Sequence, residues 1–179
     1  MFLSVKELEL EPVDFSLSLP AASLDLLPAG VSQPDPIQVS GHAAFKPALS
    51  QIRLNGQLAG AVQCACDRCL EPFPVRVDSP FDLIYEPSGQ APEQSELALS
   101  EEDSGVGFYE NGGIDLADAV REHILLLLPM QRLCRDNCLG LCPVCGVNRN
   151  EQPCSCAQPR TEERWAALRD YHPGGHGPK

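Results

Sequence analysis

The chain of 179 residues has no apolar run long enough to cross a membrane as a helix. Its first seven residues, MFLSVKE, reach charged side chains before an apolar stretch develops, which argues against a secretory signal peptide and favours a cytoplasmic location. Basic residues are also scarce, because 13 Lys and Arg face 25 Asp and Glu and the net charge is −12. We therefore expect neither a membrane partner nor a general phosphate-binding surface.

Motifs of known enzyme classes are absent as well. The sequence contains no G-x-S-x-G, P-loop, G-x-G-x-x-G or H-E-x-x-H pattern. The four histidines are scattered, and we interpret His123 as a surface or hydrogen-bonded side chain rather than a catalytic base. A cysteine nucleophile is an alternative, but metal ligation uses thiolates more naturally. We expect a protein that is not an enzyme and has no small-molecule substrate.

The charge is unevenly distributed along the chain. Residues 1–128 hold 6 basic and 20 acidic side chains, whereas residues 129–179 hold 7 basic and 5 acidic ones. Any contact with RNA is therefore expected in the last quarter, and the foremost candidates are Arg132, Arg135 and Arg149. The alternative interpretation is that these arginines only make the surface soluble. A metal ion held there by four thiolates would carry a net charge of −2 and offset the basic excess.

Strand patterns dominate the first half of the sequence. Apolar residues alternate with polar ones from residue 8 to residue 19, which predicts a strand in an acidic leading segment. Between residues 37 and 85 the alternation predicts three to five antiparallel strands. Residues 86–112 are rich in acidic side chains and glycine and contain no Lys or Arg, so we expect a flexible acidic loop there. Its alternative role is a tether for a basic partner.

One amphipathic helix is predicted after this loop. Asp115 is suited to cap it, an apolar stripe repeats at three and four residues, and Pro129 ends it. Because residues 125–128 make its end apolar all round, we expect that end to be deeply buried. A short last helix is predicted over about 162–171, docked by Trp165.

These elements predict an α+β fold: an antiparallel β-sheet with one buried helix and a cysteine-rich, metal-bound C-terminal appendage. The predicted organisation is a sheet-and-helix core at 1–133, a zinc-knuckle appendage with the short helix at 134–172, and a disordered tail at 173–179.

Nine cysteines are the strongest chemical signal in the sequence, and six of them lie between Cys134 and Cys156. A disulfide framework would need an oxidising compartment, yet the chain has no visible export signal and an odd cysteine count. Thiolate ligation of a metal in a reducing compartment fits better.

The first candidate metal site uses Cys142, Cys145, Cys154 and Cys156. Cys142-Pro143-Val144-Cys145-Gly146 is a knuckle in which a two-residue spacing places two sulfurs on one ion and the glycine takes a left-handed conformation. Four thiolates without an open position favour a structural Zn²⁺. Spacing alone leaves open a set in which Cys134 or Cys138 replaces Cys154 or Cys156. We expect residues 134–156 to unfold without metal.

A second cysteine group, Cys66 and Cys69, follows a predicted strand. This pair could bind a second Zn²⁺ together with Cys134 and Cys138, which would leave Cys64 as a buried apolar side chain. The alternatives are reduced structural thiols or a redox pair, although the βαβ context of a thioredoxin-like motif is missing.

Three sequence blocks in order resemble the bacterial YceD family. Residues 66–73, CDRCLEPF, are similar to its C-x-R-C-L-x-P-F block, residues 115–129 to its leucine-rich helix ending in Leu-Pro, and residues 138–148, CLGLCPVCGVN, to its C-x-G-L-C-P-x-C-G-x-N block. Cys154-x-Cys156 completes the order, and the resemblance covers about residues 37–172. Some members of the family lack most of the tail cysteines, so the tail metal is implied to brace the fold. Cys64 and the acidic loop are outside the family pattern and receive no role from it.

The resemblance implies a non-enzymatic ribosome-biogenesis factor that supports the synthesis, processing or stability of 23S rRNA. Its implied partners are the pre-50S ribosomal particle, 23S rRNA or a basic ribosomal protein. A hypothesis of another class is a redox-sensitive zinc thiol switch or holdase chaperone, which would release its ion on oxidation. An iron–sulfur protein is a third interpretation of the cysteines.

Overall fold

The computed structural model describes residues 1–26, 30–88 and 105–157. Its largest element is a five-stranded sheet in the order β2-β4-β5-β8-β9. The strands are β2 (Val13–Leu19), β4 (Ile37–Lys46), β5 (Gln51–Ala59), β8 (Ser79–Pro87) and β9 (Val106–Tyr109). Neighbouring strands are antiparallel except β8 and β9, which pair in parallel.

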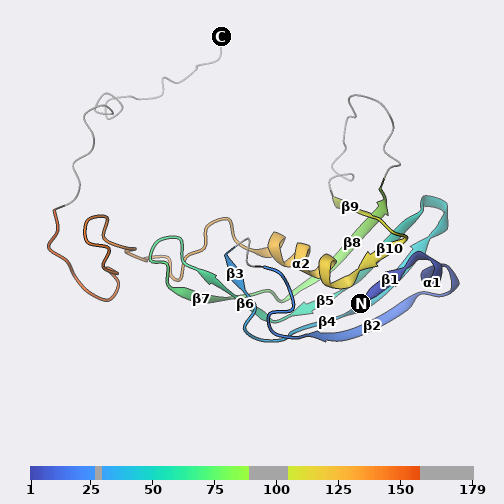
Figure 1. Ribbon diagram of the computed structural model, residues 1–179, viewed down its shortest axis with the longest axis horizontal. Helices are drawn as coiled ribbons and strands as arrows, with labels where there is room; N and C mark the ends of the chain where they lie inside the picture. Colours follow the sequence, from blue (N-terminus) through green and yellow to red (C-terminus); the bar gives the residue numbers. More distant parts are fainter. Residues whose placement is uncertain (27–29, 89–104, 158–179) are drawn as a thin grey trace, which may run out of the picture.

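Two smaller sheets flank the large one. β3 (Val31–Ser32), β6 (Ala61–Ala65) and β7 (Pro72–Arg76) form a three-stranded sheet, and β1 (Phe2–Ser4) pairs with β10 (Gly113–Asp115). The predicted α+β class and the antiparallel pairing between residues 37 and 85 are confirmed. Figure 1 shows the β6–β7 hairpin extending away from the large sheet toward the cysteine-rich segment.

Helix α2 (Leu116–Leu127) covers the sheet as the sequence predicted. Asp115 caps it by accepting a hydrogen bond from the backbone N–H of Ala117 at 2.8 Å. Its buried stripe packs against β5 and β8, where side chains of the helix and the strands surround one small apolar space: Leu54, Leu58, Phe81, Leu83, Leu116, Ala119, Val120 and His123. The expectation of deep burial at the helix end is wrong for Leu126, which is 82% exposed. It points away from the stripe that contains Ile124.

A 3₁₀ turn (Pro47–Leu49) joins β4 to β5, and the beginning of the chain contains a second helix that the sequence pattern missed. α1 (Val5–Leu10) takes in Leu8 and Leu10, which the alternation assigned to a strand. Ser4 and Glu7 form a capping box, because the Ser4 hydroxyl accepts from the Glu7 N–H and the Glu7 carboxylate accepts from the Ser4 N–H. This local signal overrides a short run of alternation, and the strand begins only at Val13.

Two facing glycines allow β4 and β5 to carry aromatic rings above them. Gly41 is paired with Gly56 across the strands. A Cβ atom at Gly56 would lie 2.2 Å from the backbone oxygen of Ser40 and 2.7 Å from the Phe81 ring. Neither position therefore accepts a larger residue without a shift of the sheet.

The predicted acidic loop at 86–112 is shorter than expected. β8 continues to Pro87, and β9 occupies Val106–Tyr109 within the predicted range. Val106, Phe108 and Tyr109 are strand-favouring residues, and pairing with β8 satisfies their backbone. Residues 89–104, the centre of the predicted loop, lie outside the described residues.

The cysteine-rich segment 130–157 contains turns but no helix or named strand. Its one ladder contact is an isolated bridge between Leu141 and Asn148. The predicted helix at 162–171 and tail at 173–179 lie outside the described residues, and the boundary at 133/134 stays a prediction. Within the described part of the chain, no helix has the length and apolar character needed to span a membrane.

Candidate metal centres

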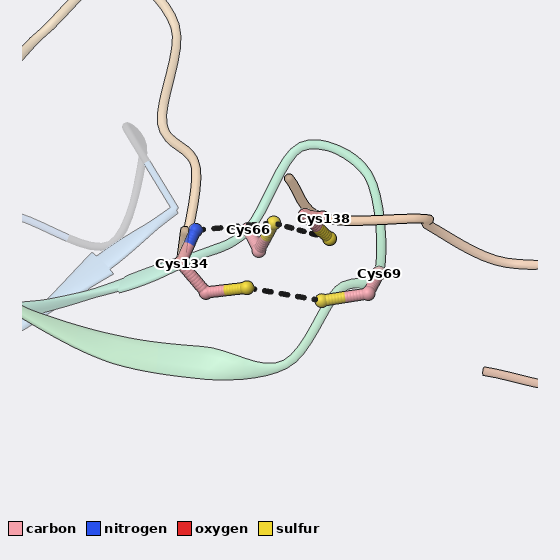
Figure 2. Close-up of side chains that lie close together, drawn as sticks. All are labelled: Cys66, Cys69, Cys134 and Cys138. Atoms are coloured by element: carbon pink, nitrogen blue, oxygen red, sulfur yellow. Dashed lines mark hydrogen bonds between the residues drawn. The ribbon is translucent and has the colours of Figure 1, made fainter. Parts of the chain in front are cut away.

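Four cysteines from two distant segments meet at the tip of the β6–β7 hairpin. Cys66 and Cys69 lie in the hairpin turn, and Cys134 and Cys138 come from the segment after α2 (Figure 2). All four Sγ atoms lie within 4.8 Å of one another. The Sγ–Sγ distances are 3.8 Å for Cys66 and Cys138 and 3.7 Å for Cys69 and Cys134. We call this set the hairpin centre.

Backbone hydrogen bonds fix the turn that carries Cys66 and Cys69. The Cys66 N–H donates to the oxygen of Glu71 at 3.0 Å, and the Leu70 N–H donates to the oxygen of Cys66 at 2.9 Å. Leu70 takes a left-handed conformation with φ of 62°. The turn therefore holds both sulfurs on one side before any ion binds.

The second segment is fastened to this turn by Asp67 and Arg68. Asp67 and Arg132 exchange two hydrogen bonds, one from the Asp67 N–H to the Arg132 oxygen at 2.8 Å and one from the Arg132 N–H to the Asp67 carboxylate at 2.7 Å. The Arg68 guanidinium donates to the backbone oxygen of Cys138 at 3.0 Å. These contacts bring Cys134 and Cys138 over the turn.

The hairpin centre is almost closed to solvent. Cys66, Cys69 and Cys138 are 0%, 3% and 4% exposed and form a separate small cluster with Phe73 and Leu133 around them. Cys134 is partly exposed, and the four sulfurs face one another, which leaves no open position for a substrate. Four such sulfurs could hold a metal ion in a structural role.

A second set, which we call the knuckle centre, lies farther along the chain. The Sγ atoms of Cys142, Cys145, Cys154 and Cys156 also lie within 4.8 Å of one another. Its turn is closed by a hydrogen bond from the Gly146 N–H to the Cys142 oxygen at 2.9 Å, with Gly146 at φ of 74°. Cys142 is buried, but Cys145 and Cys156 are exposed.

Each centre contains a thiol with a lowered pKa, and in the hairpin centre the pKa is lowered for both Cys66 and Cys138. Burial raises the pKa of Cys66, but the backbone N–H groups of Cys134, Cys69 and Arg68 outweigh it and lower the pKa to about 6. The N–H groups of Cys145 and Val144 likewise lower the pKa of Cys142 to about 6.

Each centre also contains a thiol that resists ionisation. Burial and the neighbouring thiols raise the pKa of Cys134 to about 12, and hydrogen bonding with Cys145, together with burial, raises that of Cys156 to about 12. Bringing four thiolates together therefore needs a cation to remove their repulsion.

Asn150 connects the two centres and was missed by sequence reasoning. Its Nδ2 atom donates to the Sγ atom of Cys138 at 3.3 Å and to Oδ1 of Asn148 at 2.8 Å. Its Oδ1 atom accepts from the Leu139 N–H at 2.8 Å. The only signal in the sequence was an asparagine between the two cysteine pairs of the knuckle centre, and asparagine is common in turns of every kind.

The three candidate RNA-binding arginines have different surroundings. Arg132 forms an ion pair with Asp67, Nε to Oδ1 at 3.7 Å, and its side chain is only 28% exposed. Arg135 and Arg149 are exposed. Arg132 therefore has a structural task at the hairpin centre, and RNA contact stays a prediction for all three.

Comparison with known proteins identifies the family. A sequence model described as large ribosomal RNA subunit accumulation protein YceD matches residues 54–171. The chain belongs to the YceD family. The matched span begins in β5 and includes all eight cysteines of the two centres. The family suggested by the three sequence blocks is thus confirmed.

The relatives are bacterial and plastid proteins. An uncharacterized protein of Mycobacterium tuberculosis is 31% identical over 117 residues, which cover 65% of this chain and 54% of the relative. An uncharacterized Mycobacterium leprae protein is 27% identical over 66% of this chain and 52% of its own length. The maize protein named large ribosomal RNA subunit accumulation protein YCED homolog 1, chloroplastic, is 24% identical over 66% of this chain and 48% of its own length. The chain thus spans about half the length of the relatives it matches. No solved structure matches it.

Proposed function

We propose that this YceD-family protein is a non-enzymatic ribosome-biogenesis factor that supports the synthesis, processing or stability of 23S rRNA. The match over residues 54–171 carries the proposal, because the family is described by accumulation of large-subunit rRNA. The two cysteine sets agree with a binding protein, since sites in which four thiolates could fill every ligand position hold a fold together rather than carry out a reaction. The working location is the bacterial cytoplasm, on the pre-50S particle.

The proposed metal at both centres is Zn²⁺. Four sulfur ligands at tetrahedral spacing favour a soft, redox-inactive ion that has no need of an open position. The ion would be held by Cys66, Cys69, Cys134 and Cys138 in one centre and by Cys142, Cys145, Cys154 and Cys156 in the other. Bound there, it supplies the cross-links that a segment without helix or strand needs to keep one conformation.

The charges favour a basic ribosomal protein as the direct partner over most of the surface. The chain carries a net charge of −12, and each zinc–thiolate set would add further negative charge to the appendage. The proposed contacts with 23S rRNA are Arg132, Arg135 and Arg149, of which Arg135 and Arg149 are exposed.

Depletion of the protein in its bacterial host tests the proposal. The ratio of mature 23S to 16S rRNA, measured by electrophoresis of total RNA, is expected to fall. Wild-type protein and a Cys64→Ala variant should restore it, because Cys64 belongs to neither centre. A Cys66→Ser, Cys69→Ser variant should restore it less well. An unchanged 23S to 16S ratio after full depletion would refute the function.

A thiol switch is the second candidate function, favoured by the exposure of Cys145 and Cys156. Oxidants reach exposed thiolates first, so peroxide would eject the ion of the knuckle centre before that of the buried hairpin centre. Metal release into a chelating dye at low peroxide, together with newly exposed apolar surface, supports this function. Retention of both ions under those conditions contradicts it.

A further inference from the structure

A groove far from the cysteines runs between helix α2 and strands β8, β9 and β10. It consists of two adjoining hollows of about 300 Å³ and 200 Å³. Tyr85, Ala119 and Glu122 line both hollows, so the two lie side by side along the same face of α2. Figure 1 shows α2 over the large sheet, whose edge strand β9 lies beside β8.

The walls of the groove combine polar atoms with apolar side chains that are partly uncovered. Phe108 on β9 is 66% exposed and Phe2 on β1 is 50% exposed, and both line the larger hollow. Leu126, which is 82% exposed, lines the end of the smaller one. Large apolar side chains gathered along a hollow mark an interaction surface more often than chance exposure.

The rim of this apolar groove carries charge of one sign. Asp118 and Glu122, one turn apart on α2, and Glu110 after β9 line it. Asp115 also lines it and pairs with the N-terminal ammonium group, and no Lys or Arg among the described residues does so. In the described part of the chain, neither Asp118 nor Glu122 forms an ion pair. Burial raises the pKa of Tyr85 to about 12, and the charges of Glu122 and Asp118 contribute, which agrees with carboxylates that face the groove wall.

Charge complementarity selects the occupant. An RNA strand would bring phosphates against unpaired carboxylates, which is unfavourable. A neutral apolar helix would leave those carboxylates buried without a partner. Lysine and arginine side chains satisfy both parts of the surface, because their aliphatic stems cover apolar walls and their cationic ends reach carboxylates or lie over aromatic faces.

We propose that the groove between α2 and β8–β10 binds a lysine- and arginine-rich peptide segment of a partner protein. Phe2 and Phe108 contact the side-chain stems, and Asp118 and Glu122 pair with the cationic ends. This inference rests on the proposed function, because it names the site at which a basic ribosomal protein would bind. The peptide-binding step itself rests on the groove alone and needs neither metal centre.

Fluorescence anisotropy with the full-length, zinc-loaded protein tests the groove. The probe is a fluorescein-labelled peptide of about ten residues with alternating Lys-Arg and Ala-Gly pairs. The groove variant is the double substitution Asp118→Lys and Glu122→Lys. The control is the double substitution Asp35→Lys and Asp136→Lys, which changes the net charge equally at exposed positions outside the groove. We expect the groove variant to weaken binding by at least about tenfold and the control by less than about threefold.

Phe108→Ala separates groove binding from simple charge attraction. Its side chain is mostly exposed, so truncation leaves the fold intact, and circular dichroism checks this. We expect about three- to tenfold weaker peptide binding at unchanged net charge. Equal weakening by groove and control charge variants, or no effect of Phe108→Ala, would overturn the proposal, as would displacement of the peptide by a single-stranded RNA oligonucleotide.

The outcomes for the groove and for the proposed function are distinguishable. Peptide binding that follows the groove variants, combined with an unchanged 23S to 16S ratio on depletion, would leave the groove in place and refute the ribosomal role. If peptide binding did not follow the groove variants but depletion lowered the 23S to 16S ratio, the ribosomal role would stand and the groove would have no part in it.

Discussion

The side-chain amide of Asn150 donates a hydrogen bond to the Sγ atom of Cys138 at 3.3 Å. Asn150 belongs to the loop between Cys145 and Cys154 of the knuckle centre, whereas Cys138 belongs to the hairpin centre. The same side chain accepts from the Leu139 N–H, which fixes the backbone beside that sulfur. The two cysteine sets are therefore joined through one amide group.

Removal of this amide should loosen the hairpin centre. In Asn150→Leu, the sulfur of Cys138 loses a donor that stabilises its thiolate form. Partners of this kind typically change metal affinity by about 10- to 100-fold. Transfer of Zn²⁺ to a chelating dye measures the release rate. Asn137→Leu, at an exposed neighbour of Cys138, is the matched control. Equal release rates in the two variants would contradict the role of Asn150.

The purified protein should bind two ions per chain, one at each centre. Elemental analysis of wild-type protein is expected to give two Zn²⁺, and each pair of cysteine substitutions should remove one. The double variant with Cys142→Ser and Cys145→Ser would keep the ion of the hairpin centre. The double variant with Cys66→Ser and Cys69→Ser would keep the ion of the knuckle centre. Cobalt substitution adds a check, because four thiolates give an intense charge-transfer absorption. Visible bands from anaerobically purified protein without added metal would instead indicate an iron–sulfur cluster.

Chelation should unfold the appendage and leave the sheet folded. Residues 130–157 contain no helix or named strand, and the apolar cluster at the hairpin centre consists mainly of the cysteines themselves. Metal binding in comparable peptides contributes on the order of 10 kcal/mol to folding. Limited proteolysis after treatment with a chelator should cut within 130–157 while the β-sheet circular dichroism signal persists. Protection of this segment without metal would show that the turns are stable alone.

Mild acid should destabilise the core through His123. Burial lowers the pKa of this side chain, whose ring packs edge-on against Phe81 with centroids 5.8 Å apart. The folded state disfavours the protonated form of His123. The free energy of unfolding is therefore unaffected above the ordinary pKa of His, and it decreases as the pH falls from that value through the lowered pKa of the folded state. Urea unfolding at about pH 7 and about pH 5 should show a decrease that is smaller in His123→Gln. The same decrease in both proteins would exclude His123 as its source.

Local rules predicted the main elements of the fold. Period-two alternation located β4, β5 and β8, and the cap at Asp115 with the stripe through Ile124 located α2. The rules were wrong where two signals competed, as in α1, whose capping box outweighed a short alternating run. β9 was missed because it pairs in parallel with β8 across a long connection, and such pairing leaves no local pattern.

The sequence predicted which cysteines form local pairs more easily than it predicted which pairs meet in one centre. Two-residue spacing identified Cys66 with Cys69 and Cys142 with Cys145 as pairs, because spacing is local. The partners of Cys66 and Cys69 depend on how residues some 65 positions apart meet, so the sequence left alternatives open. Asn150 and the groove beside α2 required coordinates, since hydrogen bonds to sulfur and concave surfaces have no sequence pattern.

Sedimentation of the tagged protein on a sucrose gradient, with sequencing of crosslinked RNA, tests the central claim most directly. We expect enrichment in immature large-subunit fractions, together with reads from 23S precursor. A variant with Cys66→Ser and Cys69→Ser should shift toward the free-protein fractions, and Cys64→Ala should not. Sedimentation of wild-type protein only as free protein, with no rRNA crosslinks, would contradict a role on the pre-50S particle.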